Sequence, residues 1–65
     1  MQILLNGEPL ATEADDLAAL CAELELADAK IATARNGDFV PATARAQTRL
    51  ANGDEIEIVA PRQGG

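Results

Sequence analysis

The first twelve residues predict a β-hairpin. Strands are expected at residues 2–5 and 8–12, joined by the dipeptide Asn6-Gly7. Both turn residues accept the positive φ angles that a type I′ turn requires, and this dipeptide is a strong hairpin signal. Pro9 has no backbone N–H for a sheet hydrogen bond, so the second strand is expected at the edge of the sheet.

A helix is predicted next, because apolar residues recur at positions i, i+3, i+4 and i+7. The residues of this stripe are Leu17, Leu20, Cys21 and Leu24. Asp15 or Asp16 is expected to cap the helix, which should run from about residue 16 to about residue 26. Cys21 lies within the stripe, which favours a small buried hydrophobe over a reactive thiol.

The second half of the chain predicts further strands separated by tight turns. Residues 30–35 form the third expected strand, which turns at residues 36–38 into the short segment 39–41. Residues 42–47 are expected to form either an irregular loop or a single helical turn. The remaining expected elements are a short strand at 48–50, a turn at 52–54 and a final strand at 55–60.

This order of elements predicts an α+β fold. One helix can cover only one face of a sheet, so we expect a mixed sheet of four to five strands with the helix packed on one face. The first and last strands are expected to be central neighbours with the hairpins at the flanks, which is the β-grasp arrangement. The expected core is aliphatic and consists of Ile3, Leu5, Leu17, Leu20, Leu24, Ile31, Leu50, Ile56 and Ile58.

Alternation along the strands predicts what the uncovered sheet face carries. Successive strand residues point to opposite faces, so residues between the inward isoleucines point outward. These are Gln2 and Leu4 of the first strand and Glu55, Glu57 and Val59 of the last. We expect Leu4 and Val59 to be neighbours on this face, rimmed by the two glutamates, in a small docking patch for a partner protein.

Composition limits the classes of function. The chain has 65 residues, enough for one domain, and a single aromatic residue, so a large pocket for a small molecule is not expected. Five basic residues against eleven acidic ones give a formal net charge of −6. This charge opposes nucleic-acid binding and favours association with basic partner surfaces.

The side chains that common enzyme chemistry needs are missing from the sequence. The chain has no histidine and one cysteine, so it cannot assemble a hydrolytic triad, a thiolate–imidazole zinc site or an internal disulfide. We therefore expect no catalysis by side chains and no stably bound metal or cofactor. No apolar run approaches the length of a membrane span and no signal peptide is recognised, so a cytoplasmic protein without membrane contact is expected.

The last five residues form the feature of greatest functional interest. We expect residues 1–60 to be a folded domain and residues 61–65, ending in Gly64-Gly65, to be a flexible tail. Glycines lack a Cβ and can pass through an opening that rejects larger residues. Five extended residues reach roughly 17 Å. The tail thus suits the presentation of a terminal carboxylate to another protein's active site, with a frayed end as the alternative for the tail alone.

Several segments together resemble the ThiS-type sulfur carriers of thiamine biosynthesis, which are small ubiquitin-like β-grasp proteins. The resemblance covers essentially the whole chain. It rests on Met1-Gln2-Ile3, on Asn36-Gly37-Asp38-Phe39-Val40-Pro41, on residues 50–59 and on Gly64-Gly65. Many members carry an aromatic residue after the Val-Pro pair, whereas this chain has alanine and arginine there, so residues 42–47 depart from the pattern.

The resemblance implies that the protein is a co-substrate rather than an enzyme. An E1-like adenylyltransferase of the ThiF type would use ATP and Mg²⁺ to convert the Gly65 carboxylate to an acyl-adenylate. Sulfur from a cysteine-derived persulfide donor would then form a thiocarboxylate, which delivers sulfur to a thiazole synthase of the ThiG type. Gly64, Gln63 and Arg62 would present the terminus inside each partner, and the free carrier would be a monomer.

Three alternatives stay open at this point. The small subunit of molybdopterin synthase has the same fold, tail and thiocarboxylate chemistry in the synthesis of the molybdenum cofactor, although its members are usually longer. A ubiquitin-like protein modifier would instead join its tail to lysines of other proteins. A passive binding module with an incidental Gly-Gly is the third.

Overall fold

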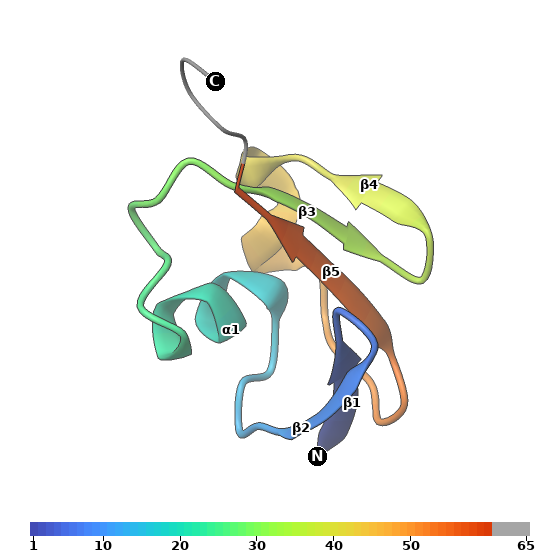
Figure 1. Cartoon of the computed structure of the whole chain (residues 1–65). Coiled ribbons are helices and arrows are strands. Elements are labelled where there is room, and N and C mark those ends of the chain that lie inside the picture. Colours follow the sequence, from blue (N-terminus) through green and yellow to red (C-terminus); the bar gives the residue numbers. More distant parts are fainter. Residues whose placement is uncertain (61–65) are drawn as a thin grey trace.

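The computed structural model describes residues 1–60, which form a five-stranded mixed sheet with α1 packed on one face (Figure 1). The strands are β1 (Gln2–Leu5), β2 (Glu8–Ala11), β3 (Ala32–Arg35), β4 (Asp38–Val40) and β5 (Glu55–Val59). The helix α1 spans Leu17–Glu23, and η1, a 3-10 helix, spans Ala42–Gln47. The strand order β2-β1-β5-β3-β4 confirms the predicted β-grasp arrangement.

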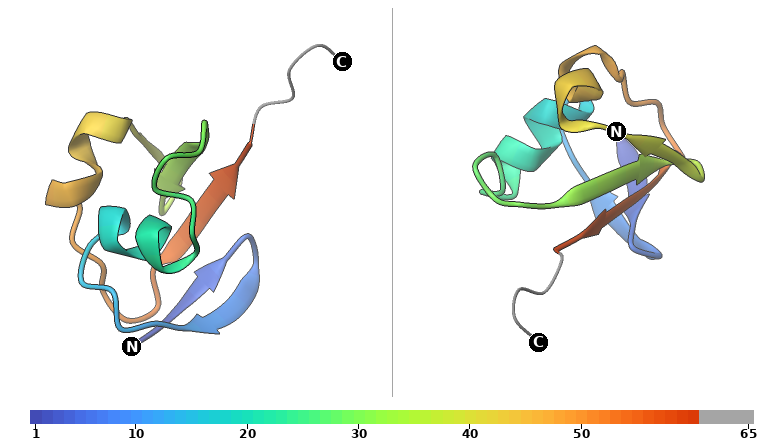
Figure 2. Two further views of the ribbon diagram at one scale, coloured as in Figure 1. Left: turned by 90° about the vertical axis from the view of Figure 1, so that its left-hand side faces the viewer. Right: turned by 90° about the horizontal axis from the view of Figure 1, so that it is seen from above.

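The sheet is mixed because β1 and β5 run parallel while both hairpins are antiparallel. In the parallel pair, Leu4 is opposite Glu55 and Leu5 is opposite Ile56. On its other side, β5 pairs antiparallel with β3 over the whole length of β3. As Pro9 predicts, β2 lies at an edge. Figure 2 shows α1 and η1 on the same side of the sheet, which leaves the opposite face without a covering helix.

Both hairpins close through the predicted Asn-Gly turns. Asn6 and Gly7 have φ angles of 51° and 86°, and Asn36 and Gly37 have φ angles of 50° and 87°. Positive φ at both central residues is the signature of a type I′ turn, whose twist matches that of the flanking strands. The local sequence therefore determines both hairpins.

The helix begins where the sequence predicts it and ends earlier. Asp16 is the N-cap, and its Oδ1 accepts a hydrogen bond of 2.7 Å from the Ala19 backbone N–H. The helix ends at Glu23, three residues before the predicted end, because Glu25 adopts a left-handed φ of 61°. The Leu26 N–H then bonds the Cys21 carbonyl at 2.7 Å, as in a Schellman C-cap.

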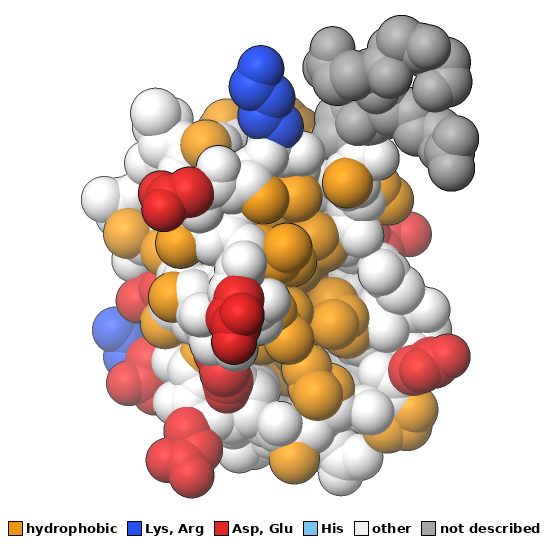
Figure 3. Space-filling model, turned by 60° about the vertical axis from the view of Figure 1, so that its left-hand side comes forward, with side chains coloured by type: hydrophobic (Ala, Val, Ile, Leu, Met, Phe, Trp, Pro, Cys, Tyr) orange, Lys and Arg blue, Asp and Glu red, His pale blue; other side chains and the backbone are white. Residues whose placement is uncertain are grey.

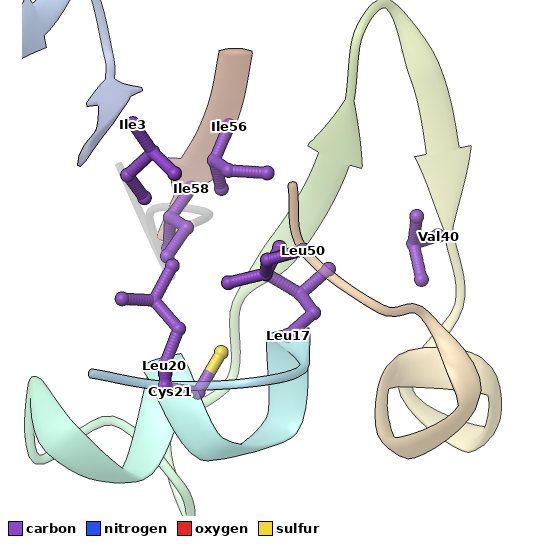
Figure 4. Packing of buried hydrophobic residues seen from close by; sticks show 9 residues of the cluster. Ile3, Leu17, Leu20, Cys21, Val40, Leu50, Ile56 and Ile58 are labelled. Carbon is purple, nitrogen blue, oxygen red and sulfur yellow. The ribbon is translucent and has the colours of Figure 1, made fainter. Parts of the chain in front are cut away.

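The core lies between α1 and the sheet, where side chains from both layers point toward one another (Figure 4). Six of the nine predicted core residues are buried, while Leu5, Leu24 and Ile31 are only partly buried. The buried hydrophobic residues are Ile3, Ala14, Leu17, Leu20, Cys21, Val40, Leu50, Ile56 and Ile58. Burial raises the pKa of the Cys21 thiol, and this effect is larger than the lowering by the positive charge of Arg45. The raised pKa agrees with the interpretation of Cys21 as a small buried hydrophobe.

The prediction of a strand at residues 48–50 is wrong. This segment makes an isolated antiparallel bridge between Arg49 and Asp16. Its backbone bonds the residues that lead into α1: the Leu50 N–H donates to the Asp15 carbonyl at 2.9 Å, and the Leu17 N–H donates to the Thr48 carbonyl at 2.9 Å. The segment thus fastens the start of the helix instead of extending the sheet. The open question at residues 42–47 is resolved as the 3-10 helix η1.

A buried carboxylate, that of Asp54, ties the start of β5 to the end of β3. Asp54 is 7% exposed, and its carboxylate accepts hydrogen bonds from Arg35 Nε (2.9 Å), Asn36 Nδ2 (3.1 Å) and the Ala51 N–H (2.8 Å). Burial raises the pKa of the Asp54 carboxyl, but the Arg35 contact and the two other hydrogen bonds outweigh burial and hold the pKa below its ordinary value.

This network makes stability depend on pH in a defined direction. Because the folded-state pKa of Asp54 lies below the unfolded-state value, its contribution is complete above about pH 4 and is lost as pH falls through the depressed pKa. We expect Asp54→Asn to lower the free energy of unfolding by about 1–3 kcal/mol at neutral pH. Urea unfolding of both proteins across pH should show this difference shrinking in acid. Asp38→Asn, at an exposed position, is the matched control and should change little.

The C-cap of α1 gives a second stability prediction. A residue with a side chain is destabilised by roughly 1–2 kcal/mol in the left-handed region, and glycine avoids this cost. Glycine also raises the conformational entropy of the unfolded chain, which cancels part of the gain. Glu25→Gly should therefore stabilise the domain by about 0.5–1 kcal/mol and raise the melting temperature by several degrees. Ala22→Gly, inside the same helix, should lower the melting temperature instead. Thermal unfolding followed by circular dichroism tests the pair, and a lower melting temperature for Glu25→Gly would contradict the cap assignment.

Candidate functional site: the open sheet face and the strand that leads to the tail

Two of the most exposed large hydrophobic side chains lie on the open sheet face. Phe39 is 70% exposed and Val59 is 59% exposed. The register brings them together, because Ala34 is opposite both Phe39 and Glu57, and Ala32 is opposite Val59. These residues line one shallow hollow. We name the set Ala32, Ala34, Phe39 and Val59 the Phe39–Val59 patch.

The expected pairing of Leu4 with Val59 is wrong. Leu4 is opposite Glu55, at the start of β5, whereas Val59 is at its end. Four residues of strand separate the two positions by about 13 Å. Leu4 is also half-buried and lies opposite Pro9 on its other side. Alternation placed both residues on the correct face, but only the register shows that Phe39 is the apolar side chain grouped with Val59.

The alternation rule, extended to the second hairpin, puts Phe39 and Val40 on opposite faces of the sheet, and the structure decides which of the two is outward. Val40 points to the core and is 7% exposed, so its neighbour Phe39 must point outward. An outward aromatic residue is a common anchor of protein interfaces. The alternation of the first and last strands alone does not reveal this residue.

Of the two predicted glutamates, Glu55 lies beside Leu4, and Glu57 lies between Glu55 and Val59 along β5. Both Glu55 and Glu57 are exposed on β5. Glu57 lines the hollow at the patch, and it shares a second hollow with Glu55 and Leu4. The open face thus has an apolar end, toward Val59, and an acidic middle. This arrangement suits a partner with an apolar contact surface beside basic residues.

A second apolar surface has a different origin. Figure 3, turned by 60° from the view of Figure 1, shows hydrophobic side chains in a strip with acidic side chains to its left and right. Several side chains pack only partly against the core, namely Leu5, Leu10, Leu24, Leu26, Ile31 and Ala44. A small domain has too little chain to bury all of its apolar residues, which accounts for such partial burial.

The predicted tail residues Gly65, Gly64, Gln63 and Arg62 lie outside the described residues. The structure does show the strand that leads to them. β5 lies between β1 and β3 and ends at Val59. The last residues of β5 are bonded from two sides: β3 pairs up to Val59, and the Asn6 side-chain amide bonds both the N–H and the carbonyl of Ile58.

The stretch that departs from the ThiS pattern has a structural role through Arg45. Arg45 Nε donates to Thr33 Oγ1 at 3.1 Å, and its Nη2 donates to the Ile31 carbonyl at 2.9 Å. These bonds fasten η1 to β3. The arginine in this stretch therefore supports the fold.

Residues 1–60 contain neither a metal-binding cluster nor a membrane-spanning helix. No group of three or more acidic, cysteine or histidine side chains in this part of the chain is arranged to hold a metal ion. No helix among these residues is long and apolar enough to cross a membrane.

Comparison with known families shows to which family the chain belongs. Residues 3–65 match the ThiS family. The chain belongs to the ThiS family. The resemblance to ThiS-type sulfur carriers is thereby confirmed, and the match extends through Gly64-Gly65.

Two solved structures of thiamine biosynthesis proteins are similar over the whole of this chain. The crystal structure of a thiamine biosynthesis protein (ThiS) from Geobacter metallireducens is similar with a TM-score of 0.83 and 26% identity, and all of both chains is covered. The solution NMR structure of a thiamine biosynthesis protein from the same organism gives a TM-score of 0.80 and 25% identity, covering all of this chain and 88% of that one.

A further relative is much longer than this chain. It is a thiazole synthase from Paramagnetospirillum magneticum, 38% identical over 66 residues, which are 100% of this chain and 20% of that protein. This ThiS chain therefore spans about a fifth of the length of the curated relative that it matches.

Proposed function

We propose that this ThiS-family protein is a sulfur carrier in thiamine biosynthesis and that it carries sulfur as a thiocarboxylate on Gly65. The observation that carries the proposal is the family match over residues 3–65, which includes the Gly64-Gly65 pair. It is supported by the whole-chain similarity to a thiamine biosynthesis protein with the same β-grasp fold. The protein acts as a co-substrate, and the enzymes that process it supply the catalysis.

The proposed chemistry takes place at the backbone carboxylate. A carboxylate is a poor electrophile because oxide is a very poor leaving group. An E1-like adenylyltransferase of the ThiF type joins the Gly65 carboxylate to AMP from ATP, with Mg²⁺ and release of pyrophosphate. The terminal sulfur of a persulfide then forms a C–S bond as AMP leaves, and a thiol reductant cleaves the S–S bond to give the thiocarboxylate.

The fold suits this role because β5 leads directly to the reactive end. β5 is held on both sides within the sheet, and residues 61–65 follow shortly after it. An extended segment of five residues reaches roughly 17 Å from the domain. The Gly-Gly pair, without side-chain bulk, fits a narrow catalytic channel. Gln63 and Arg62 connect this pair to the domain and present it to the partner.

The proposed acceptor of the sulfur is a thiazole synthase of the ThiG type. Support comes from the relative named thiazole synthase, in which a segment similar to this whole chain occupies a fifth of the protein. A carrier-like segment within a protein of that name points to a working association between the two. The thiamine names of the solved relatives likewise favour this role over that of the molybdopterin synthase subunit.

We propose the open sheet face as the docking surface for these partners. Phe39 and Val59 supply apolar contact, and the exposed Glu55 and Glu57 supply charge that attracts basic residues. Leu4 lies beside Glu55 on this face and contributes less, because it is half-buried. Since the patch ends at Val59, a partner bound there also lies beside the start of the tail.

Intact mass spectrometry tests the proposed chemistry. The protein is incubated with ATP, Mg²⁺, a ThiF-type enzyme, a persulfide donor and a reductant. We expect a mass increase equal to the replacement of one oxygen by one sulfur, located by fragmentation on Gly65. Protein isolated from its native source must also end at Gly65, because further residues would leave no carboxylate there. Recovery as an isopeptide conjugate would indicate a protein modifier instead.

A change in the tail should block activation without unfolding the domain. Gly64→Val places a branched side chain where the proposed channel admits only backbone. We expect the thiocarboxylate yield to fall by at least about 100-fold, since misplacing a reacting group costs this much, with an unchanged melting temperature. Ala11→Val adds a similar side chain on the β2 edge and should leave the yield normal. A normal yield from Gly64→Val would refute the proposed route.

A second change tests the docking surface. Phe39→Ser should weaken binding to the ThiF-type enzyme by about 1–2 kcal/mol, roughly tenfold in Kd, because the exposed aromatic residue of the patch is removed. Val59→Ser should act in the same direction with a smaller effect. Ala11→Ser, exposed on the same face but outside the patch, is the matched control. Isothermal titration calorimetry measures the three affinities, and equal affinities for all would exclude the patch.

A further inference from the structure

Asn6 makes contacts that its place in a turn does not require. A type I′ turn needs a residue that accepts positive φ, and glycine does this equally well. In this chain the Asn6 Nδ2 also donates to the Ile58 carbonyl at 3.1 Å, and its Oδ1 accepts from the Ile58 N–H at 3.0 Å. A side-chain amide that donates and accepts at once presents the same groups as a backbone peptide unit. It therefore serves as one more rung of the β1–β5 ladder.

The hydrogen bonds of the Asn6 side chain continue the β1–β5 pairing beyond the end of β1. On this side of β5, the Leu4 N–H donates to the Asp54 carbonyl at 2.9 Å and the Asn6 N–H donates to the Ile56 carbonyl at 2.8 Å. The chain then turns away into β2 (Figure 1). Backbone groups of alternate residues face the same neighbouring strand, so Ile58 comes next on this edge. The Asn6 amide occupies the place where β1 has already ended.

We infer that Asn6 is a positioning residue for the sulfur-transfer reaction. By holding the end of β5 in the sheet, it fixes the point from which the tail leaves the domain. The reaction at the tail rests on the proposed function. The hydrogen bonds by which Asn6 holds the end of β5 do not depend on it. A tail that starts from a fixed point loses less conformational freedom on entering a catalytic channel than one that starts from a frayed strand. The effect should appear in binding, thus in KM, and leave kcat unchanged.

The second Asn-Gly turn supplies a matched control within the same chain. Asn36 has nearly the same backbone conformation, with φ 50° followed by Gly37 at 87°. Its Oδ1 accepts from the Glu55 N–H at 2.9 Å, and its Nδ2 donates to Asp54 at 3.1 Å. Asn36→Gly thus removes two side-chain hydrogen bonds at the start of β5, and Asn6→Gly removes two near its end. Glycine is compatible with both turns.

Amide hydrogen exchange of the free protein tests the hold on β5. In Asn6→Gly we expect exchange at the Ile58 N–H to accelerate by about tenfold, because one net hydrogen bond no longer opposes local opening. In Asn36→Gly the acceleration should occur at Glu55 and leave Ile58 near its wild-type rate. Unchanged exchange at Ile58 in Asn6→Gly would overturn the inference. Asn6→Asp keeps the acceptor but sets an oxygen against the Ile58 carbonyl, so it should not restore protection.

Adenylation kinetics test the positioning role. ATP–pyrophosphate exchange is measured with a ThiF-type enzyme while the carrier concentration is varied, and thermal unfolding checks that each variant is folded. Asn6→Gly should raise KM for the carrier by roughly three- to tenfold at unchanged kcat, whereas Asn36→Gly should stay near wild type. Equal increases in both variants, or no increase in Asn6→Gly, would overturn the positioning role. A wild-type protein that is not adenylated would contradict the proposed function itself, and the positioning role would fall with it, while the exchange data would still decide the hold on β5.

Discussion

The parallel pairing of β1 with β5 is the constraint on which the rest of this structure depends. It joins residues 2–5 to residues 55–59, so nearly the whole chain lies in the connection between the two paired strands. A parallel pair cannot be closed by a tight turn and needs a crossover. The helix α1 supplies part of that crossover and covers the face from which Ile3, Ile56 and Ile58 point. The other face of β5 then stays open.

A core this small is supplemented by polar side chains that fasten the connections. Asp54 links the loop before β5 to the end of β3, Arg45 fastens η1 to β3, and Asn6 and Asn36 bond β5 from both neighbouring turns. Each of these groups satisfies backbone or charged partners that would otherwise lose their hydrogen bonds. Within residues 1–60, every buried side-chain nitrogen and oxygen has such a partner. A fully satisfied network of this kind favours a single arrangement of the loops.

How much of this could be predicted from the sequence depends on the range of the interactions. The two Asn-Gly turns and the inward isoleucines of β5 follow from local preference and alternation, and both predictions are confirmed. For the N-cap, local preference leaves Asp15 and Asp16 open, and the structure assigns it to Asp16. The strand at 48–50 was predicted wrongly because its hydrogen bonds go to residues 15–17, a pairing that no local pattern contains. The early helix end depends on Glu25, a residue that gives no left-handed signal.

The candidate site shows the same division between features that follow from local sequence and features that depend on long-range pairing. Alternation assigned Leu4, Glu55, Glu57 and Val59 to the open face, but the distance along the sheet depends on the β1–β5 register. That register sets Leu4 opposite Glu55 and leaves Val59 beside the second hairpin, where Phe39 lies. The contact between Asn6 and Ile58 depends on the same register, because only the position at which β1 ends brings the amide to that peptide. Sequence patterns give the face of a residue, whereas its neighbours require the assembled sheet.

The proposed function also explains why the open face carries so small an apolar patch. In the proposed function, the activating enzyme and the sulfur acceptor would both need the same tail, so the carrier would have to leave the first before it reached the second. A large apolar surface would hold the first partner too long, since affinity among related complexes is set mainly by dissociation. Two exposed apolar side chains beside two glutamates, on a chain with a net charge of −6, instead favour fast electrostatically guided association with modest affinity. Selectivity would then rest on the tail, which both partners must admit, and on the fixed strand end that presents it.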